Sequence, residues 1–179
     1  LPYEGVKTGT ALSLGKRTLQ FVATPMLHWP DSMVTYCPEE NILFSNDAFG
    51  QHLAANQRFD DENDLALLRQ AAKKYYANIR MRDGKQAQTA LKALAALPID
   101  IIAVGHGVLW RSHIPEILAA YQQWSTGTLE DRAVVVFDSM WHSTETMALT
   151  IADAFSEKGL PVGYYDLRAN HISDIVTDI

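Results

Sequence analysis

The sequence predicts an α/β chain in two parts, and two patterns carry this prediction. Before Thr126-Gly127-Thr128, short β-prone runs alternate with loops and helical segments. After it, an apolar run, a hydroxyl-rich loop, a helix and a second apolar run follow one another, which is typical of a parallel βαβ unit. We therefore expect a boundary in a short linker there, with parts at 1–128 and 129–179.

The first part is predicted to hold four strands and three helices. The strands are expected at 18–23, 33–36, 41–44 and 99–104, and the helices at 60–79, 86–97 and 116–124. Acidic residues at 60–64 favour a helix N-terminus, and Pro115 is suited to the start of the last helix. Gly84 is expected to break the helical pattern and Pro98 to end the second helix.

The second part begins with a continuous apolar run at 132–137, as expected of a buried parallel strand. Met147, Ile151 and Phe155 then recur at helical spacing within a helix predicted at 143–156, so we expect them to pack on the core. A second strand is predicted at 161–167.

Composition excludes several classes of protein. The net charge of -6 and the pI near 5.4 argue against a nucleic-acid groove, and 47% hydrophobic residues is ordinary for a chain that buries a core. No apolar run approaches the roughly 18 residues that cross a bilayer. The single cysteine, Cys37, cannot form an internal disulfide, and no signal peptide is visible. We expect a cytoplasmic enzyme with no membrane partner.

Three candidate metal ligands each follow a β-prone run. His28 lies in TPMLHWPDSM (24–33), Asp47 in LFSNDAFG (43–50) and His106 in AVGHGVLW (103–110). Imidazole and carboxylate suit iron, zinc and manganese, and a carboxylate can bridge two ions. The alternative is structural: a lone histidine after a strand is often simply hydrogen-bonded, and an Asp there often closes an Asx turn.

A candidate phosphate loop follows the apolar run of the second part. Its residues are Ser139, Met140, Trp141, His142, Ser143 and Thr144. Hydroxyl donors and backbone N–H groups at a helix N-terminus suit a phosphate. The same residues could simply cap the helix. The absence of Gly-x-Gly-x-x-Gly argues against a dinucleotide.

These segments, in this order, resemble flavodiiron proteins, the A-type flavoproteins. The run FSNDAFGQH (44–52) is similar to the flavorubredoxin, nitric-oxide-reducing branch. The resemblance implies that His28, Asp47 and His106 are ligands of two iron ions, with Asp47 bridging, and that 139–144 holds FMN. It also implies the C-terminal part of a metallo-β-lactamase-like αββα sandwich at 1–128, followed by the N-terminal part of a flavodoxin-like doubly wound domain at 129–179.

The resemblance further implies reduction of nitric oxide to nitrous oxide, of oxygen to water, or of both. Rubredoxin, or a fused rubredoxin domain with an NADH-dependent reductase, would supply electrons, and the protein would form a head-to-tail homodimer. The family's His-x-Glu-x-Asp motif is missing from the sequence. We therefore expect an internal fragment that is inactive by itself and binds iron weakly.

Two other classes remain open. A zinc hydrolase of the metallo-β-lactamase superfamily would share the histidine and aspartate positions, using zinc to generate hydroxide. The flavin loop disfavours it. The chain could also be a non-catalytic homologue that lacks a complete iron site.

Overall fold

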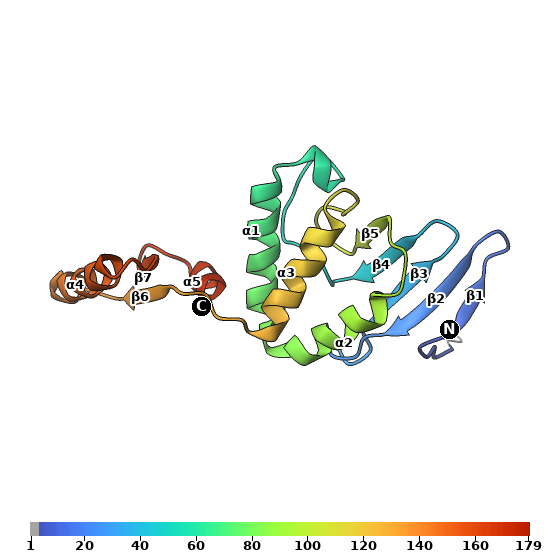
Figure 1. Cartoon of the computed structure of the whole chain (residues 1–179), viewed down its shortest axis with the longest axis horizontal. Helices are drawn as coiled ribbons and strands as arrows, with labels where there is room; N and C mark the ends of the chain where they lie inside the picture. Colours follow the sequence, from blue (N-terminus) through green and yellow to red (C-terminus); the bar gives the residue numbers. More distant parts are fainter. Residues whose placement is uncertain (1–3) are drawn as a thin grey trace. The chain divides into compact units, whose positions relative to one another are not determined.

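The computed structural model describes residues 4–179, except for the side chains of residues 80 and 82. The chain divides into two compact units, Leu1–Thr128 and Leu129–Ile179. Both contain strands and helices (Figure 1), which confirms the α/β class. Within the described part of the chain, no helix is long and apolar enough to cross a membrane.

The first unit is built on a five-stranded sheet whose spatial order follows the sequence. Its strands are β1 (Ala11–Ser13), β2 (Thr18–Ala23), β3 (Met33–Cys37), β4 (Ile42–Asn46) and β5 (Ile101–Val104). Strands β1 to β4 pair antiparallel, and β5 joins β4 in parallel. All of these except β1 were predicted. The three residues of β1 are all exposed, so the strand has no alternation that the sequence could reveal.

Three helices follow in the first unit. They are α1 (Leu65–Tyr75), α2 (Gly84–Leu94) and α3 (Ile114–Thr126). Asp64 caps α1, accepting hydrogen bonds from the N–H groups of Ala66 and Leu67. The helix predicted at 60–79 thus begins five residues later than expected, at Leu65. A short 3₁₀ turn occupies Asp60–Glu62, and a π-helical turn, Tyr76–Arg80, continues α1.

The helical pattern does break between α1 and α2, but at the 3₁₀ turn Met81–Asp83, and Gly84 is the first residue of α2. A Cβ at this position would lie 2.7 Å from the carbonyl oxygen of Ser125, near the end of α3. Glycine is required for close approach between the two helices, and not for a loop.

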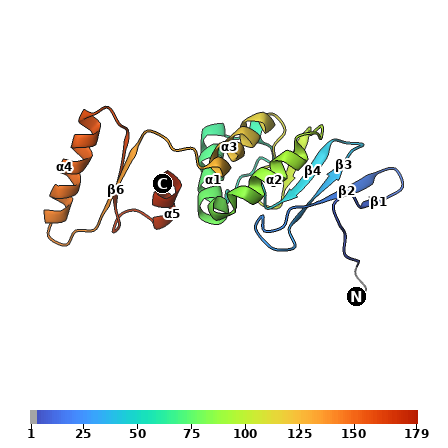
Figure 2. The ribbon, with the colours of Figure 1, turned by 60° about the horizontal axis from the view of Figure 1, so that its bottom comes forward.

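One hydrophobic core joins the sheet to the three helices. Its fully buried members include Leu43 of β4, Ile102 of β5, Leu68 of α1 and Trp110. The helices lie together beside the sheet in both views (Figure 2).

The second unit is a βαβα segment. It comprises β6 (Ala133–Phe137), α4 (Ser143–Glu157), β7 (Val162–Asp166) and α5 (Ile172–Asp178), and its two strands pair in parallel. Asp178 ties α5 to the strands by accepting hydrogen bonds from Arg132 and from the Tyr165 hydroxyl. Helix α5 was not predicted from the sequence.

The expected apolar stripe of α4 was also wrong. Met147, Ile151 and Phe155 are exposed, whereas Ala148 and Ala152 are buried. Small side chains four residues apart let the helix backbone come close to the strands. The spacing of the large hydrophobic residues therefore predicted the wrong buried face of α4, one that lies next to the true one.

Candidate metal centre and phosphate loop

The three predicted ligands come together because their strands end at one edge of the sheet. Since β2 and β4 are both antiparallel to β3, and β5 is parallel to β4, the chain leaves all three strands in the same direction. His28 follows β2, Asp47 follows β4 and His106 follows β5. The sequence predicted that each of these residues follows a strand, and the order of the strands in the sheet brings the three residues together.

Asp47 lies between the two histidines and faces each with a different oxygen. The Nε2 atom of His28 is 3.2 Å from Oδ2, and the Nε2 atom of His106 is 3.5 Å from Oδ1. When two ligand atoms bind the same ion through bonds of about 2.1 Å, the distance between them is about 3.0 Å in octahedral geometry and about 3.4 Å in tetrahedral geometry. The His28 distance lies within this range and the His106 distance just above it, so these three residues have donor atoms near the spacing that metal ligands need.

Among the described residues, no group of three or more His, Cys, Asp or Glu side chains has the arrangement to hold a metal ion. The Asp47 geometry explains this, since each ion would receive only two donors from His28, Asp47 and His106. Two donors give little chelate advantage, so we still expect these residues alone to bind a metal weakly.

The His106 ring is oriented by a hydrogen bond on its other nitrogen. Its Nδ1 atom is 3.3 Å from the carbonyl oxygen of Gln51. A carbonyl can only accept, so Nδ1 is the donor in this contact, and Nε2 is the nitrogen that faces Asp47 and could bind a metal. This is the pattern expected of a ligand.

Two further aromatic residues adjoin His106. The His52 ring centroid lies 5.1 Å from that of His106, and the Tyr75 ring lies 4.9 Å from each of them. The resemblance to flavodiiron proteins also implied that His52 lies near the site. It did not suggest Tyr75, whose only signal was its place on the apolar face of α1.

The Asp47 loop is fixed by the core beneath it. Phe49 has a positive φ of 66°, and its N–H donates to the Tyr121 hydroxyl at 2.8 Å. The carbonyl of Phe49 accepts from Trp110 Nε1 at 2.9 Å, and Ser45 Oγ donates to the Ala48 carbonyl at 2.7 Å. The loop that carries Asp47 is thus held by buried hydrogen bonds on both sides.

Replacing Gly107 by alanine should destabilise the first unit and displace the His106 loop. Gly107 has a φ of +89°, and a Cβ there would lie 2.0 Å from Gln51 Oε1 and 2.4 Å from the Gln51 carbonyl oxygen. The backbone strain alone costs about 1–2 kcal/mol, and the clash adds to it. Urea denaturation measures the loss. Gly127→Ala is the control, because Gly127 has a φ of +64° but no atom within 4 Å of the added Cβ. Equal losses of unfolding free energy in Gly107→Ala and Gly127→Ala would show that the clash with Gln51 contributes nothing.

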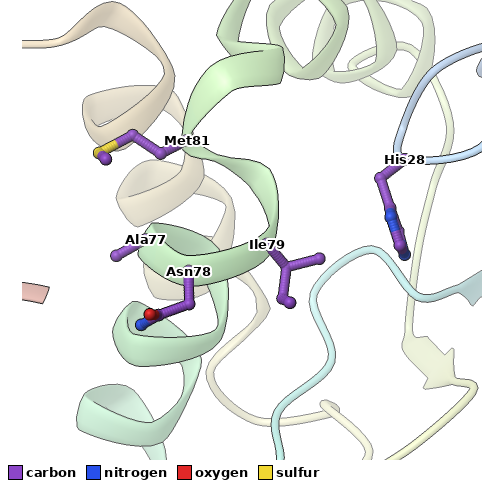
Figure 3. A pocket seen from close by; sticks show the side chains of 5 residues that line it. All are labelled: His28, Ala77, Asn78, Ile79 and Met81. Atoms are coloured by element: carbon purple, nitrogen blue, oxygen red, sulfur yellow. The ribbon is translucent and has the colours of Figure 1, made fainter. Parts of the chain in front are cut away.

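A cavity of about 350 Å³ adjoins His28. It is lined by His28, Ala77, Asn78, Ile79 and Met81. Figure 3 shows Ile79 directed from the π-helical turn toward His28. Its largely aliphatic wall suits a small uncharged molecule.

The candidate phosphate loop connects β6 to the N-terminus of α4. Ser139 Oγ is buried and has no hydrogen-bond partner among the described residues. His142 is the N-cap of α4 with a left-handed φ of 62°, and no side chain caps the helix. The start of α4 therefore lacks the side-chain cap that the alternative interpretation of this loop requires. An orphaned hydroxyl beside an uncapped helix start fits a phosphate.

The remaining predicted residues of this loop point outward or begin the helix. Met140, Trp141 and His142 are exposed, and His142 Nδ1 lies 2.5 Å from Glu145 Oε2. Ser143 and Thr144 form the first turn of α4 and are also exposed. The loop therefore presents polar groups and two large apolar side chains to solvent.

Comparisons with known proteins agree with this description of the first unit. Residues 3–107 match the family described as ODP family beta lactamase. A protein named nitric oxide reductase from Moorella thermoacetica is 45% identical over 179 residues, covering 99% of this chain and 45% of that protein.

Two solved structures extend the comparison to nearly the whole chain. The flavodiiron protein from Giardia intestinalis has a TM-score of 0.94 and 38% identity, covering 97% of this chain and 43% of that one. The rubredoxin oxygen:oxidoreductase from Desulfovibrio gigas has a TM-score of 0.93 and 40% identity, covering 97% of this chain and 44% of that one.

The chain spans less than half the length of these relatives. The family match covers more than half of the chain, and the similarity continues through the second unit. The chain therefore belongs to the flavodiiron protein family and contains its ODP β-lactamase-like domain.

Proposed function

We propose that this chain supplies part of the diiron centre and the FMN phosphate loop of an oxidoreductase that reduces nitric oxide to nitrous oxide or oxygen to water. In this proposal, the first unit is the C-terminal part of a metallo-β-lactamase-like sandwich, and the second is the N-terminal part of a flavodoxin-like domain. The observation that carries it is Asp47, whose two oxygens face the Nε2 atoms of His28 and His106 separately.

When bound, the two irons would supply open positions for the diatomic substrate, and the flavin would supply electrons. Asp47 would hold the ions together and offset their repulsion, while His28 and His106 bind as neutral ligands. The cavity beside His28 has room for a diatomic molecule. Nitrous oxide formation joins two NO molecules with two electrons and two protons, and releases one water.

The FMN proposal rests on Ser139, whose buried hydroxyl would donate to the phosphate beside the start of α4. The name of the Desulfovibrio relative indicates rubredoxin as electron donor. We extend this to a rubredoxin, free or fused, that is served by an NADH-dependent reductase. We also propose that the protein is a head-to-tail homodimer.

Asp47→Asn should lower the affinity of the chain for divalent metal by about tenfold or more, because a neutral amide neither bridges two cations nor balances their charge. Anaerobic titration with Fe²⁺, and with Co²⁺ as a visible-absorbing substitute, measures this. Asp31→Asn is the matched control, since Asp31 is an exposed carboxylate in the His28 loop. Equal affinities in the two variants would count against a metal role for Asp47.

The same protein should bind FMN, and Ser139→Ala should weaken that binding. With both cofactors present and a chemical reductant, consumption of NO or O₂ at an electrode tests the reaction. Zinc-dependent hydrolysis of a β-lactam without FMN binding would favour the hydrolase instead.

A further inference from the structure

We propose that Gln51 is a positioning residue for His106, acting through a side-chain clamp on the loop that carries the histidine. The inference rests on the proposed metal role of His106. Gln51 lies in the Asp47 loop and is 0% exposed. A buried amide with this placement has to be satisfied by hydrogen bonds, and its partners all lie beside the site.

The carboxamide of Gln51 pairs with both backbone groups of one residue across the site. Its Nε2 donates to the Val108 carbonyl at 2.9 Å, and its Oε1 accepts from the Val108 N–H at 2.7 Å. This two-way pairing also fixes the orientation of the amide, because a flipped group would set donor against donor. The two hydrogen bonds thus fix the distance between Val108 and the Asp47 loop.

The backbone of Gln51 contacts His106 in the same two-way manner. The Gln51 N–H donates to the His106 carbonyl at 3.4 Å, and the Gln51 carbonyl accepts from His106 Nδ1 at 3.3 Å. These are long hydrogen bonds, so small movements of either loop would break them. The side-chain clamp two residues further along keeps the loops close enough for both.

Glycines at two positions make room for this contact. A Cβ on Gly50 would lie 2.8 Å from His106 Cε1, and a Cβ on Gly107 would meet the Gln51 side chain and carbonyl. The Asp47 and His106 loops thus approach each other at van der Waals distance around Gln51. The clamp aligns His106 Nε2 with Asp47 and keeps the proton on Nδ1.

Gln51→Met tests the clamp, because methionine fills similar volume without either hydrogen bond. The first readout is NMR of the ¹⁵N-labelled, metal-free chain. In the wild type, the His106 Nδ1–H proton should be observed and should exchange slowly with water. In Gln51→Met it should be lost. The His113 Nδ1–H, which faces Asp60 Oδ2 at 3.0 Å, should persist throughout as an internal reference.

Gln88→Met is the matched control. Gln88 Nε2 also donates to a backbone carbonyl, that of Ser125, at 2.7 Å, but it does not contact the site. This variant should retain the His106 signal even where it lowers stability. If Gln51→Met does not fold, Gln51→Asn serves instead, since its amide is too short to reach both groups of Val108.

Co²⁺ affinity is the second readout, with a loss of about tenfold or more expected for Gln51→Met and none for Gln88→Met. A His106 signal and a Co²⁺ affinity that both survive in Gln51→Met would overturn the proposal. If the wild type shows the expected proton signals but binds no Co²⁺, the clamp stands and the proposed function fails.

Discussion

Asp60→Ala should lower the free energy of unfolding by about 3–5 kcal/mol, because it removes the shared acceptor of several buried donors. Asp60 is 0% exposed and accepts hydrogen bonds from the backbone N–H groups of Arg111, Ser112 and His113. The ring of His113 adds a further contact at 3.0 Å. The carboxylate thus secures the start of α3, where its charge also favours the helix dipole.

Because of Asp60, we also expect the protein to lose stability in acid. Burial by itself raises the pKa of Asp60, but hydrogen bonds from the N–H groups of Arg111, His113 and Ser112 outweigh it, so the pKa lies below its ordinary value. The stabilisation is therefore full above the unfolded pKa of about 3.9, and is lost as the pH falls through the lowered folded value.

Urea denaturation between neutral pH and pH 3, followed by near-UV circular dichroism, measures both effects. Asp60→Asn should flatten the acid side of the curve, because the amide does not titrate. Asp61→Asn is the control, since Asp61 is exposed and pairs with Arg111 at the surface, where ion pairs contribute little. A steep acid loss that persists in Asp60→Asn would assign it to other groups.

Trp110→Ala should cost about 3–5 kcal/mol, the range for removing a large aromatic side chain from a packed core. Trp110 is 0% exposed, and its backbone pairs with Ile102 of β5. Its Nε1 also donates to the carbonyl of Phe49, in the Asp47 loop. The substitution should therefore weaken both the core and the metal site above it.

Trp110→Phe separates these two contributions. Phenylalanine keeps most of the packing but leaves the Phe49 carbonyl without this donor, at a cost of about 1–3 kcal/mol. Trp141→Ala is the control, because Trp141 is 81% exposed and its loss should leave the unfolding free energy nearly unchanged. Chemical denaturation measures all three variants. Equal effects of the alanine and phenylalanine substitutions would show that packing contributes little.

The sequence was reliable where one local pattern decides the structure. Strands β2 to β5 were predicted because their apolar runs end at polar loops. The start of α3 was predicted from Pro115, because proline suits the first turn of a helix. For the same reason, each of His28, Asp47 and His106 could be placed at a strand end.

The sequence failed where a distant contact decides. Gly84 looked like a helix break, but it is glycine because α2 begins against Ser125. Asp60 was expected to belong to an acidic helix start, yet it is buried and accepts hydrogen bonds from the N–H groups of Arg111, Ser112 and His113, more than fifty positions away. The face of α4 was misjudged because hydrophobicity does not show how closely a helix approaches its strands.

The sequence by itself determined the α/β class, the family and the identity of the candidate ligands, because these follow from residue type and local order. Only the tertiary structure decided that the two histidines face separate oxygens of Asp47, and that Gln51 joins the Asp47 loop to the His106 loop. Those relations depend on strand order and on contacts between separate loops that are distant in the sequence, which local patterns do not encode.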